Sequence, residues 1–310
     1  SGNPRLSPGP EGEHLPDRLA REAVKFITAQ RDQPVLVYFP FYSVHTPLMA
    51  REDLRLKYEE KRRRLDLGER WGREGEREVR EVQSHAVYAG MIEAMDLAVG
   101  RVLQALDDLG RREDTLVVFT SDNGGLSTSE GSPTSNLPLR AGKGWMYEGG
   151  IRVPLIVRWP GVARPGSVVA APVSSPDFFP TFLAAAGVTA PAGPADGRSL
   201  VPVLRGETPA ERALFWHYPH YGNQGGAPAA AVRRGNWKLI TWHEDGREEL
   251  FDLAADLGER RDLAAREPAR VAALRTELRA WQQDVGAKFP VPNPAYDPAV
   301  PSGRAAPRKQ

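Results

Sequence analysis

The sequence contains no cysteine among its 310 residues. This absence excludes disulfide bonds and thiolate metal sites, and it gives no information about the redox state of the compartment. The chain also lacks any apolar run close to the ~20 residues that cross a bilayer as a helix. Its formal net charge is only +1, so affinity for anions has to be local. We therefore expect neither nucleic acid nor a membrane as a partner.

The remaining composition is that of a folded protein. Hydrophobic residues make up 41% of the chain, which supports a sizeable core. Glycine and proline, with 30 and 28 residues, stay below the combined share of about 25–30% that signals disorder. The length allows two domains, or one large domain with a subdomain.

A short β-branched run ends in polar residues at positions 116–125, which read LVVFTSDNGG. Leu116–Phe119 is predicted to be a buried strand, and Asp122 and Asn123 follow its carboxyl end. Ligands of open α/β sheets bind at that edge. One carboxylate and one amide oxygen suit Ca²⁺ or Mg²⁺. The alternative is that Asp-Asn-Gly-Gly is only a turn that ends the strand.

A glycine-rich cationic stretch follows at 139–154, LRAGKGWMYEGGIRVP. Glycines beside Arg140, Lys143 and Arg152 would let backbone N–H groups approach an oxyanion closely. A divalent metal together with a lysine suggests a tetrahedral oxyanion, either sulfate or phosphate. Glu148 and Arg152 are first expected to form a structural pair that shapes the glycine turn.

SDNGG followed by LRAGKGWMYEGGIRVPLIVRWPG resembles the second half of a type I sulfatase, of the arylsulfatase group in the alkaline phosphatase superfamily. Further segments are similar to this family in family order: FPFYSVHTPL (39–48), YAGMIEAMDLAVGRVLQALDDLG (88–110), SPDFFPTFLAAAG (175–187), DGRSLVPVL (196–204), and WKLI with EELFDLAADLGERRDL (237–263). The resemblance implies an incomplete alkaline-phosphatase-like catalytic domain. It covers most of the chain.

The resemblance also implies roles for single residues. Asp122 and Asn123 would bind the metal, Ca²⁺ with Mg²⁺ as an option. Lys143 would contact the sulfate oxygens, and Arg140 the substrate. His45, just beyond a strand end, would contact the ester and help protonate the leaving oxygen; the alternative is an ordinary surface histidine.

One departure from the family concerns the nucleophile, a formylglycine made from Cys or Ser in a C/S-x-P-x-R motif. The sequence has no such motif, and the nearest match, at 174–178, has Phe178 in place of arginine. The paired N-terminal aspartates and the first lysine and histidine of the family are missing too. The chain opens with neither an initiator Met nor a signal peptide. We expect the C-terminal part of a longer sulfatase, with little or no activity alone.

Residues 1–205 are predicted to form the α/β part. A helix from Asp17 to about Gln30, a strand at 35–39, a helix from Ser84 to Gly110 and the strand at 116–119 predict a mostly parallel central sheet flanked by helices. Residues 51–83 mix Arg, Lys and Glu, and we expect a solvated helical excursion there. A heparin- or nucleic-acid-binding patch is the disfavoured alternative, because acids offset the bases.

Residues 206–310 are predicted to form a C-terminal α+β subdomain. Four short strands, at 214–218, 229–233, 237–241 and 249–253, precede a helical apolar stripe from Val271 to Val285. These elements predict a small antiparallel sheet with one helix. An extended tail over 287–310 is expected to lie on the surface.

The stretch FWHYPHYGNQGG (215–226) offers sugar-like hydrogen-bonding and stacking groups. We expect His217 and His220 to contact substrate, with a buried Trp/Tyr cluster as the alternative. The predicted function is a sulfuric ester hydrolase acting on sulfated glycans or aryl sulfates, and export to the periplasm or outside the cell is implied by family habit. Two alternatives stay open: a phosphoryl hydrolase of the same superfamily, or a non-catalytic sulfated-glycan-binding module.

Overall fold

The computed structural model describes residues 9–189 and 196–294, which divide into two compact units. The first unit takes in the described part of 1–69 together with 82–117 and 158–160. The second holds 70–81, 118–157 and the described part of 161–310. Among the described residues, no helix combines the length and apolar character that crossing a bilayer requires. The surface tail expected over 287–310 lies largely outside the described residues.

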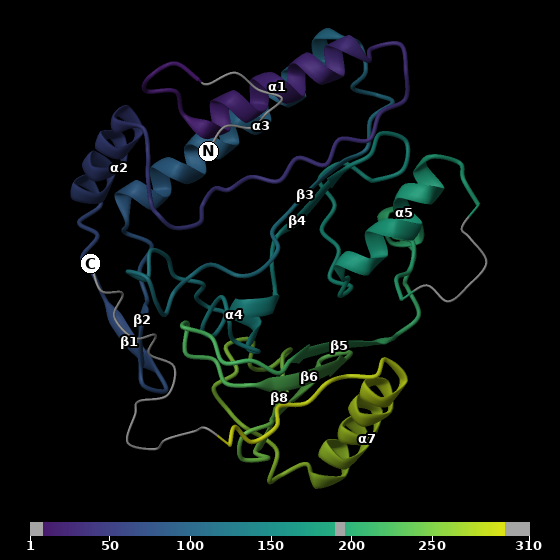
Figure 1. Cartoon of the computed structure of the whole chain (residues 1–310). Helices are drawn as coiled ribbons and strands as arrows, with labels where there is room; N and C mark the ends of the chain where they lie inside the picture. Colours follow the sequence, from purple (N-terminus) through teal and green to yellow (C-terminus); the bar gives the residue numbers. More distant parts are fainter. Residues whose placement is uncertain (1–8, 190–195, 295–310) are drawn as a thin grey trace. The chain divides into compact units, whose positions relative to one another are not determined.

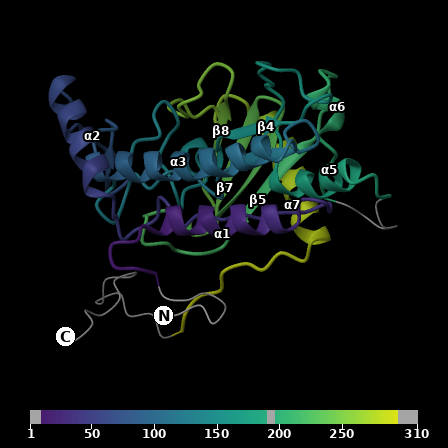
Figure 2. The same cartoon turned by 90° about the horizontal axis from the view of Figure 1, so that it is seen from above.

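Three helices build the first unit. Helices α1 (Leu15–Ala29) and α2 (Glu52–Arg64) both pack against α3 (Ala86–Asp108) (Figures 1 and 2). The predicted stripe of α3 is its packing face, since Met91, Ala98 and Leu106 are buried. The helix starts one residue later than predicted: His85 Nδ1, rather than Ser84, accepts the backbone N–H of Tyr88 at 3.3 Å.

The predicted strand at 35–39 is wrong, because residues 34–41 belong to no helix or strand. Leu36 and Tyr38 are 78% and 88% exposed, so this apolar run packs against little of the described chain. A strand needs a neighbour for its N–H and C=O groups, and no described strand pairs with this one. Of the expected central sheet the structure shows one pair, β3 (Val117–Thr120) with β4 (Leu155–Arg158).

The predicted helical excursion at 51–83 is only half correct. After α2 the chain forms a hairpin of β1 (Trp71–Glu74) and β2 (Arg77–Arg80), with Gly75 at φ 55° in the turn. The Arg80 guanidinium lies 4.4 Å from the Trp71 ring centroid, and Arg80 Nε donates to Ser132 O at 2.6 Å. Tertiary contacts of charged side chains therefore hold strands that their composition does not predict.

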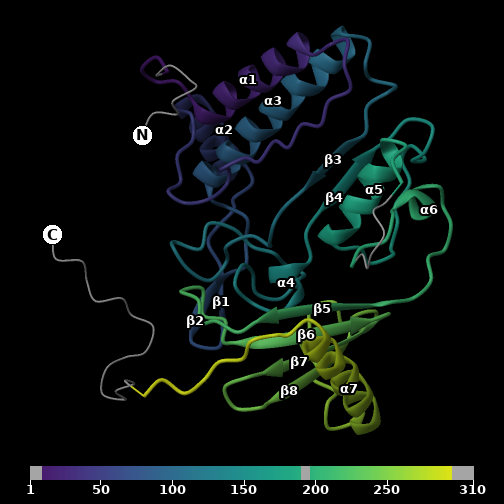
Figure 3. The ribbon, with the colours of Figure 1, turned by 45° about the vertical axis from the view of Figure 1, so that its right-hand side comes forward.

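The antiparallel sheet predicted for the C-terminal part is confirmed. Its strands are β5 (Ala213–Tyr218), β6 (Ala229–Arg234), β7 (Trp237–Trp242) and β8 (Glu248–Asp252), paired in that order. Helix α7 (Pro268–Asp284) covers one face, where Val271, Leu274 and Leu278 pack on alternate strand residues (Figure 3). Strand alternation thus gives the sheet two distinct buried faces.

The second face of this sheet receives the glycine-rich stretch. Trp145, Met146 and Tyr147 pack there against residues of β6, β7 and β8, including Ile240, Trp242 and Phe251. The short helix α4 (Glu148–Ile151) follows directly. The C-terminal sheet is therefore the platform on which the predicted cationic segment rests.

The segment after β4 carries a buried carboxylate. Asp177 ends the turn η1 (Ser175–Asp177), which leads into α5 (Phe178–Ala185) and, further on, α6 (Val201–Leu204). The Asp177 side chain is 0% exposed and pairs with Arg212. Its two oxygens also accept the backbone N–H groups of Ser174 and Arg198, both at 2.8 Å. Burial opposes the charge, but Arg212 and these amides hold the pKa of Asp177 below its ordinary value.

Asp177→Asn is expected to lower the free energy of unfolding by about 1.5–3 kcal/mol, the usual cost of losing hydrogen bonds to a charged group. The stabilisation by Asp177 is present above the pKa of an unfolded aspartate, about 3.9, and is lost as the pH falls through the lower folded pKa. Urea unfolding at pH 7 should therefore show a clearly lower free energy of unfolding for Asp177→Asn than for the unchanged protein. This difference in free energy should become smaller below about pH 4. Asp284→Asn, at an exposed position, is the matched control; an equal effect of both changes would refute this account.

Candidate active site

Asp122 and Asn123 follow β3 directly, as predicted. Asp122 is exposed, and its Oδ1 accepts the N–H of Asn123 at 2.9 Å. Asn123 Nδ2 donates to Gly124 O at 3.0 Å, which turns the amide oxygen Oδ1 the other way. Ser121 Oγ steadies the turn by donating to Asn123 O at 2.9 Å. Two hard oxygens are thus presented beyond the strand end.

Backbone hydrogen bonds join this turn to the glycine-rich segment. The N–H of Gly124 donates to Gly150 O at 2.9 Å, and the N–H of Lys143 donates to Gly125 O at 3.1 Å. The backbone of Lys143 is therefore hydrogen-bonded to Gly125, which lies two positions after Asn123. Both stretches belong to the second unit. The structure therefore brings the backbone of Lys143 to the turn after the predicted metal pair, although Asn123 and Lys143 are 20 positions apart in the sequence.

Asn136 fastens the same junction from the loop at 126–139. Its Oδ1 accepts from Gly125 N at 3.1 Å, and its Nδ2 donates to Gly125 O at 2.8 Å and Ala141 O at 2.9 Å. Thr128 Oγ1 accepts from Trp145 Nε1 at 3.2 Å. Much of this loop is buried, so it is a structural part of the site rather than a loose surface connection.

The glycines serve backbone packing more than anion binding. A Cβ at Gly124 would lie 1.7 Å from Gly149 O, and one at Gly150 would lie 2.1 Å from Trp145 O. The N–H groups of Gly124, Gly149 and Gly150 donate to protein carbonyls. The expectation that amides of the glycine-rich stretch face an oxyanion is therefore wrong at Gly149 and Gly150. Only residues without a Cβ allow the two segments to approach so closely.

The metal pair supplies only part of a coordination sphere. Within the described residues there is no group of three or more His, Cys, Asp or Glu side chains that could hold an ion. Ca²⁺ takes about 6–8 oxygen ligands, and Mg²⁺ about six. One carboxylate and one amide oxygen fit either ion in kind, but they do not complete its coordination.

Arg140 has a structural role, contrary to the predicted substrate contact. Its Nε and Nη2 donate to the Glu74 carboxylate at 2.9 and 2.7 Å, and Nη1 donates to Glu259 O at 2.7 Å. The guanidinium also stacks 3.7 Å from the centroid of the Tyr147 ring. All three guanidinium nitrogens donate hydrogen bonds. The guanidinium therefore links the glycine-rich segment to β1 and to the loop before α7.

His217 does not face the glycine-rich segment, and its predicted substrate contact is corrected. Strand alternation puts it on the α7 face, with Phe215. Its Nδ1 accepts from Gln282 Nε2 at 3.1 Å, so its Nε2 donates to Lys288 O at 2.7 Å. Trp216, the next residue back, packs on the other face. The sequence already indicated that His217 and Trp216 lie on opposite faces of the sheet, because successive side chains of a strand point to opposite faces.

His220 is exposed beyond β5, with its ring 5.4 Å from that of Tyr218 in an edge-on arrangement. Its substrate contact stays a prediction. Gln224, from the same stretch, accepts Trp145 Nε1 through its backbone O at 3.0 Å. The 215–226 stretch therefore does meet the glycine-rich segment, at Trp145.

His45 lies in an exposed loop of the first unit, where its N–H donates to Tyr42 O at 2.9 Å. Its Nδ1 lies 2.8 Å from Thr46 O, a contact that requires the proton on Nδ1. That His45 and Asp122 act in one site stays a prediction, because the two residues belong to different units.

Sequence reasoning missed a buried charge cluster beneath the glycine-rich segment. Lys238 Nζ lies 3.1 Å from Glu148 Oε1 and 2.9 Å from Glu259 Oε1, and all three side chains are at most 1% exposed. Glu259 Oε2 also accepts the N–H of Glu148 at 2.6 Å. The predicted Glu148–Arg152 pair is confirmed at 3.7 Å. Alternation in WKLITW already places Lys238 on the same face as Ile240 and Trp242, which was the available signal.

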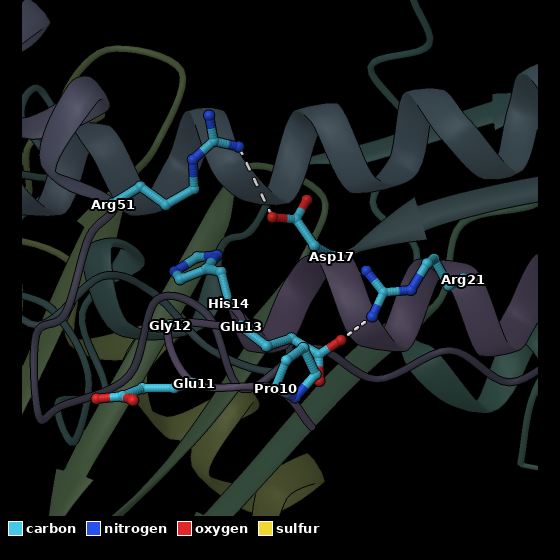
Figure 4. Close-up of a pocket in the computed structure, with 8 residues that line it drawn as sticks. All are labelled: Pro10, Glu11, Gly12, Glu13, His14, Asp17, Arg21 and Arg51. Carbon is cyan, nitrogen blue, oxygen red and sulfur yellow. Dashed lines mark ion pairs between the residues drawn. The ribbon is translucent and has the colours of Figure 1, made fainter. Parts of the chain in front are cut away.

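A pocket of the first unit does not belong to this site. It encloses about 560 Å³ around the start of α1, and none of the predicted site residues lines it (Figure 4). Two of its three carboxylates pair with cations: Glu13 with Arg21, and Asp17 with Arg51 at 3.7 Å. Ion pairs therefore neutralise much of the charge in this pocket.

Comparison with known proteins identifies the class to which this fold and site belong. The sulfatase family model matches residues 2–188, and a model described as N-sulphoglucosamine sulphohydrolase, C-terminal, matches 141–284. The chain belongs to the sulfatase family. A sulfatase of Formosa agariphila is 36% identical over 306 residues, covering 90% of this chain and 52% of the relative. Mouse steryl-sulfatase is 37% identical over 288 residues, covering 80% and 41%.

Solved structures show the same fold. Ps i-CgsB, determined with k-i-k-neocarrahexaose, superposes with a TM-score of 0.72 at 28% identity over 90% of this chain and 57% of its own. BT4656, determined with D-glucosamine-2-N,6-O-disulfate, gives 0.56 at 29% identity, over 66% and 42%. A phosphonate monoester hydrolase of Silicibacter pomeroyi gives 0.51 at 30%, over 64% and 40%. The predicted α/β, alkaline-phosphatase-like class is confirmed, and the chain spans about half the length of the proteins it matches, or less.

Proposed function

We propose that this chain supplies the metal-binding and sulfate-binding part of the active site of a sulfuric ester hydrolase. The observation that carries the proposal is the backbone junction of Gly124–Gly125 with Lys143 and Gly150. It joins the backbone of Lys143 to the turn that follows Asp122 and Asn123, which supports a site made of an ammonium, a carboxylate and an amide oxygen. That combination suits a dianionic or monoanionic tetrahedral group bound next to a divalent cation.

Each residue has a distinct task in this proposal. Asp122 and Asn123 would hold Ca²⁺, or Mg²⁺, which neutralises charge on the non-bridging sulfate oxygens when it is bound. Lys143 places a second positive charge on the same oxygens. The role of His45, protonation of the leaving oxygen, stays what the family resemblance implies. The nucleophile is not among these residues, since the sequence has no C/S-x-P-x-R motif.

Sulfated glycans are the proposed substrate class, with aryl sulfates as the simpler option. The structures of Ps i-CgsB and BT4656 were determined with a carrageenan-type oligosaccharide and a glucosamine disulfate. In this chain, exposed His220 and Tyr218 offer hydrogen bonding and stacking near the stretch that reaches Trp145. A periplasmic or secreted location is proposed from family habit.

The chain by itself is expected to turn over no chromogenic aryl sulfate above the buffer rate, in Ca²⁺ or Mg²⁺. The family nucleophile is absent from its sequence, and charge stabilisation alone does not break the S–O bond. The assay is release of the phenol from 4-nitrophenyl sulfate, with the product of the complete reading frame as the comparison. Turnover by the isolated chain at the rate of the longer product would overturn this account.

A phosphoryl hydrolase of the same superfamily is the second candidate, favoured by the similarity to the phosphonate monoester hydrolase. Sulfate and phosphate share their geometry, so Asp122, Asn123 and Lys143 do not separate them. The complete protein assayed on matched aryl sulfate and aryl phosphonate esters does so: a higher kcat/KM on the phosphonate would replace the sulfatase proposal. Binding of sulfated glycan without hydrolysis of either ester would instead favour the non-catalytic binding module.

A further inference from the structure

A second pocket opens on the α7 face of the C-terminal sheet. It encloses about 420 Å³ between the end of β7 and the last turns of α7. Its lining residues come from both elements and from the segment after the helix: Thr241, His243, Arg275, Leu278, Arg279, Gln282, Gln283, Gly286, Ala287 and Phe289. The glycine-rich segment with Lys143 packs on the opposite face of the same sheet. The pocket is therefore separate from the candidate active site.

Two polar atoms of this pocket lack a partner. Thr241 Oγ1 and His243 Nε2 are buried, and neither has a hydrogen bond within the described part of the chain. Buried polar atoms are almost always satisfied, by protein, water or a ligand. A space of about 420 Å³ exceeds what one or two waters occupy, since each takes about 30 Å³ in the liquid. The pocket has room for a ligand with hydroxyl groups.

The charge of the lining is positive. It contains two arginines and a histidine but no carboxylate. Arg275 is held by Glu248, at 2.6 Å from its Nε. Arg279, one helical turn further on, has no ion-pair partner among the described residues. One guanidinium at the rim is thus available for an anionic group.

An aromatic ring borders the same space. Phe289 is 52% exposed, and its ring stands edge-on to those of His217 and His243, at 5.2 and 5.3 Å. His217 fixes the segment by donating to Lys288 O at 2.7 Å. Burial and the nearby His217 ring lower the pKa of His243, so its imidazole is neutral and can donate or accept. An exposed ring face beside hydroxyl partners is typical of a saccharide site.

We propose that this pocket binds an acidic saccharide unit, with Thr241 and His243 on its hydroxyls, Phe289 against its ring and Arg279 on its sulfate group. The choice of sulfate over another acidic group depends on the proposed function. The site would hold a neighbouring unit of a glycan away from the catalytic residues.

The test is an NMR titration of this chain with a sulfated carrageenan disaccharide, followed on the imidazole signals of His217 and His243. The desulfated disaccharide and inorganic sulfate are the companion probes. Arg279→Gln should weaken binding of the sulfated probe at least about tenfold, the effect of losing a charge-assisted hydrogen bond. Arg266→Gln, an exposed arginine outside the pocket, should leave it unchanged. Lys143→Ala should also leave the His243 response unchanged.

Each other outcome overturns the inference. Equal affinity for the sulfated and the desulfated disaccharide would show that the pocket does not recognise the sulfate group. No shift of His243 at up to roughly 10 mM probe would mean that water alone fills the pocket. Binding lost in Lys143→Ala but kept in Arg279→Gln would place all recognition at the candidate active site, and the proposed function would then stand without the second site.

Discussion

Replacing Lys238 by methionine is expected to lower the free energy of unfolding by about 3–5 kcal/mol, the usual cost of removing one partner from a buried ion pair. Methionine keeps the length of the side chain but leaves Glu148 and Glu259 without their shared cation. Burial already raises the pKa of Glu259, and Lys238 acts against that shift. The measurement is urea unfolding followed by tryptophan fluorescence at pH 7.

Two further variants make this result specific. Lys288→Met, an exposed lysine of the same unit, should change the free energy of unfolding by no more than about 0.5 kcal/mol. Lys238→Met combined with Glu259→Gln should recover part of the loss, because one buried charge is removed together with its partner. If Lys238→Met and Lys288→Met unfold at the same urea concentration, the cluster does not stabilise the fold.

The cluster also explains how the C-terminal sheet reaches the candidate active site. Glu148 opens α4, five residues after Lys143, and is held from below by Lys238 of β7 and, at 3.5 Å, by Arg233 of β6. Arg140, three residues before Lys143, is held by Glu74 and by Glu259 O. The segment that carries Lys143 is thus fixed on both sides by buried charges. The family model that matches 141–284 includes Glu148, Arg233, Lys238 and Glu259 of this arrangement, but not Arg140 or Glu74.

Lys143→Ala in the product of the complete reading frame is expected to lower kcat/KM on an aryl sulfate by about 10²–10³-fold, equivalent to about 3–4 kcal/mol of transition-state stabilisation. The reason is electrostatic: in the proposed site the ammonium of Lys143 would already face the charged sulfate oxygens, so no reorganisation would be needed during the reaction. The measurement is steady-state kinetics with an unfolding curve for each protein, so that loss of activity is separated from loss of structure.

The sequence predicted those elements whose side-chain pattern matches their own packing. The four strands of the C-terminal sheet alternate between two buried faces, and α7 carries one apolar stripe, so local periodicity and tertiary burial agree. The same holds for α3, whose apolar stripe packs against α1 and α2. Strand β3 forms close to its predicted position, but it is not the buried strand that was expected: Val117, Val118 and Phe119 are half-buried and Thr120 is exposed.

Elements that depend on distant partners were predicted poorly. The apolar run at 35–39 has the composition of a strand, but no described strand pairs with it. The hairpin of β1 and β2 has the composition of a solvated helix, yet Glu74 and Arg80 are buried by contacts with Arg140 and Ser132. Composition does not report partners that lie 52 and 66 residues away in the sequence.

The roles of Asp122, Asn123 and Lys143 in the candidate site came from motif resemblance and stay predictions. The structure adds the backbone hydrogen bonds that join the turn after Asn123 to the segment that carries Lys143. Arg140 was predicted to contact substrate because a cation among glycines suggests an anion site. In the structure its guanidinium is hydrogen-bonded to the Glu74 carboxylate instead. His217 was misassigned because the alternation of β5 was not applied to it. Lys238 was overlooked, although its place on an apolar face was visible in the strand pattern.

The most direct test of the site is the turnover of 4-nitrophenyl sulfate by the complete protein carrying Lys143→Ala, measured beside Lys25→Ala as an exposed control. The account predicts a fall of at least about 10²-fold for Lys143→Ala with an unchanged unfolding curve, and full activity for Lys25→Ala. Equal activity of the two variants would contradict the placement of the sulfate group at the junction of the SDNGG turn and the glycine-rich segment.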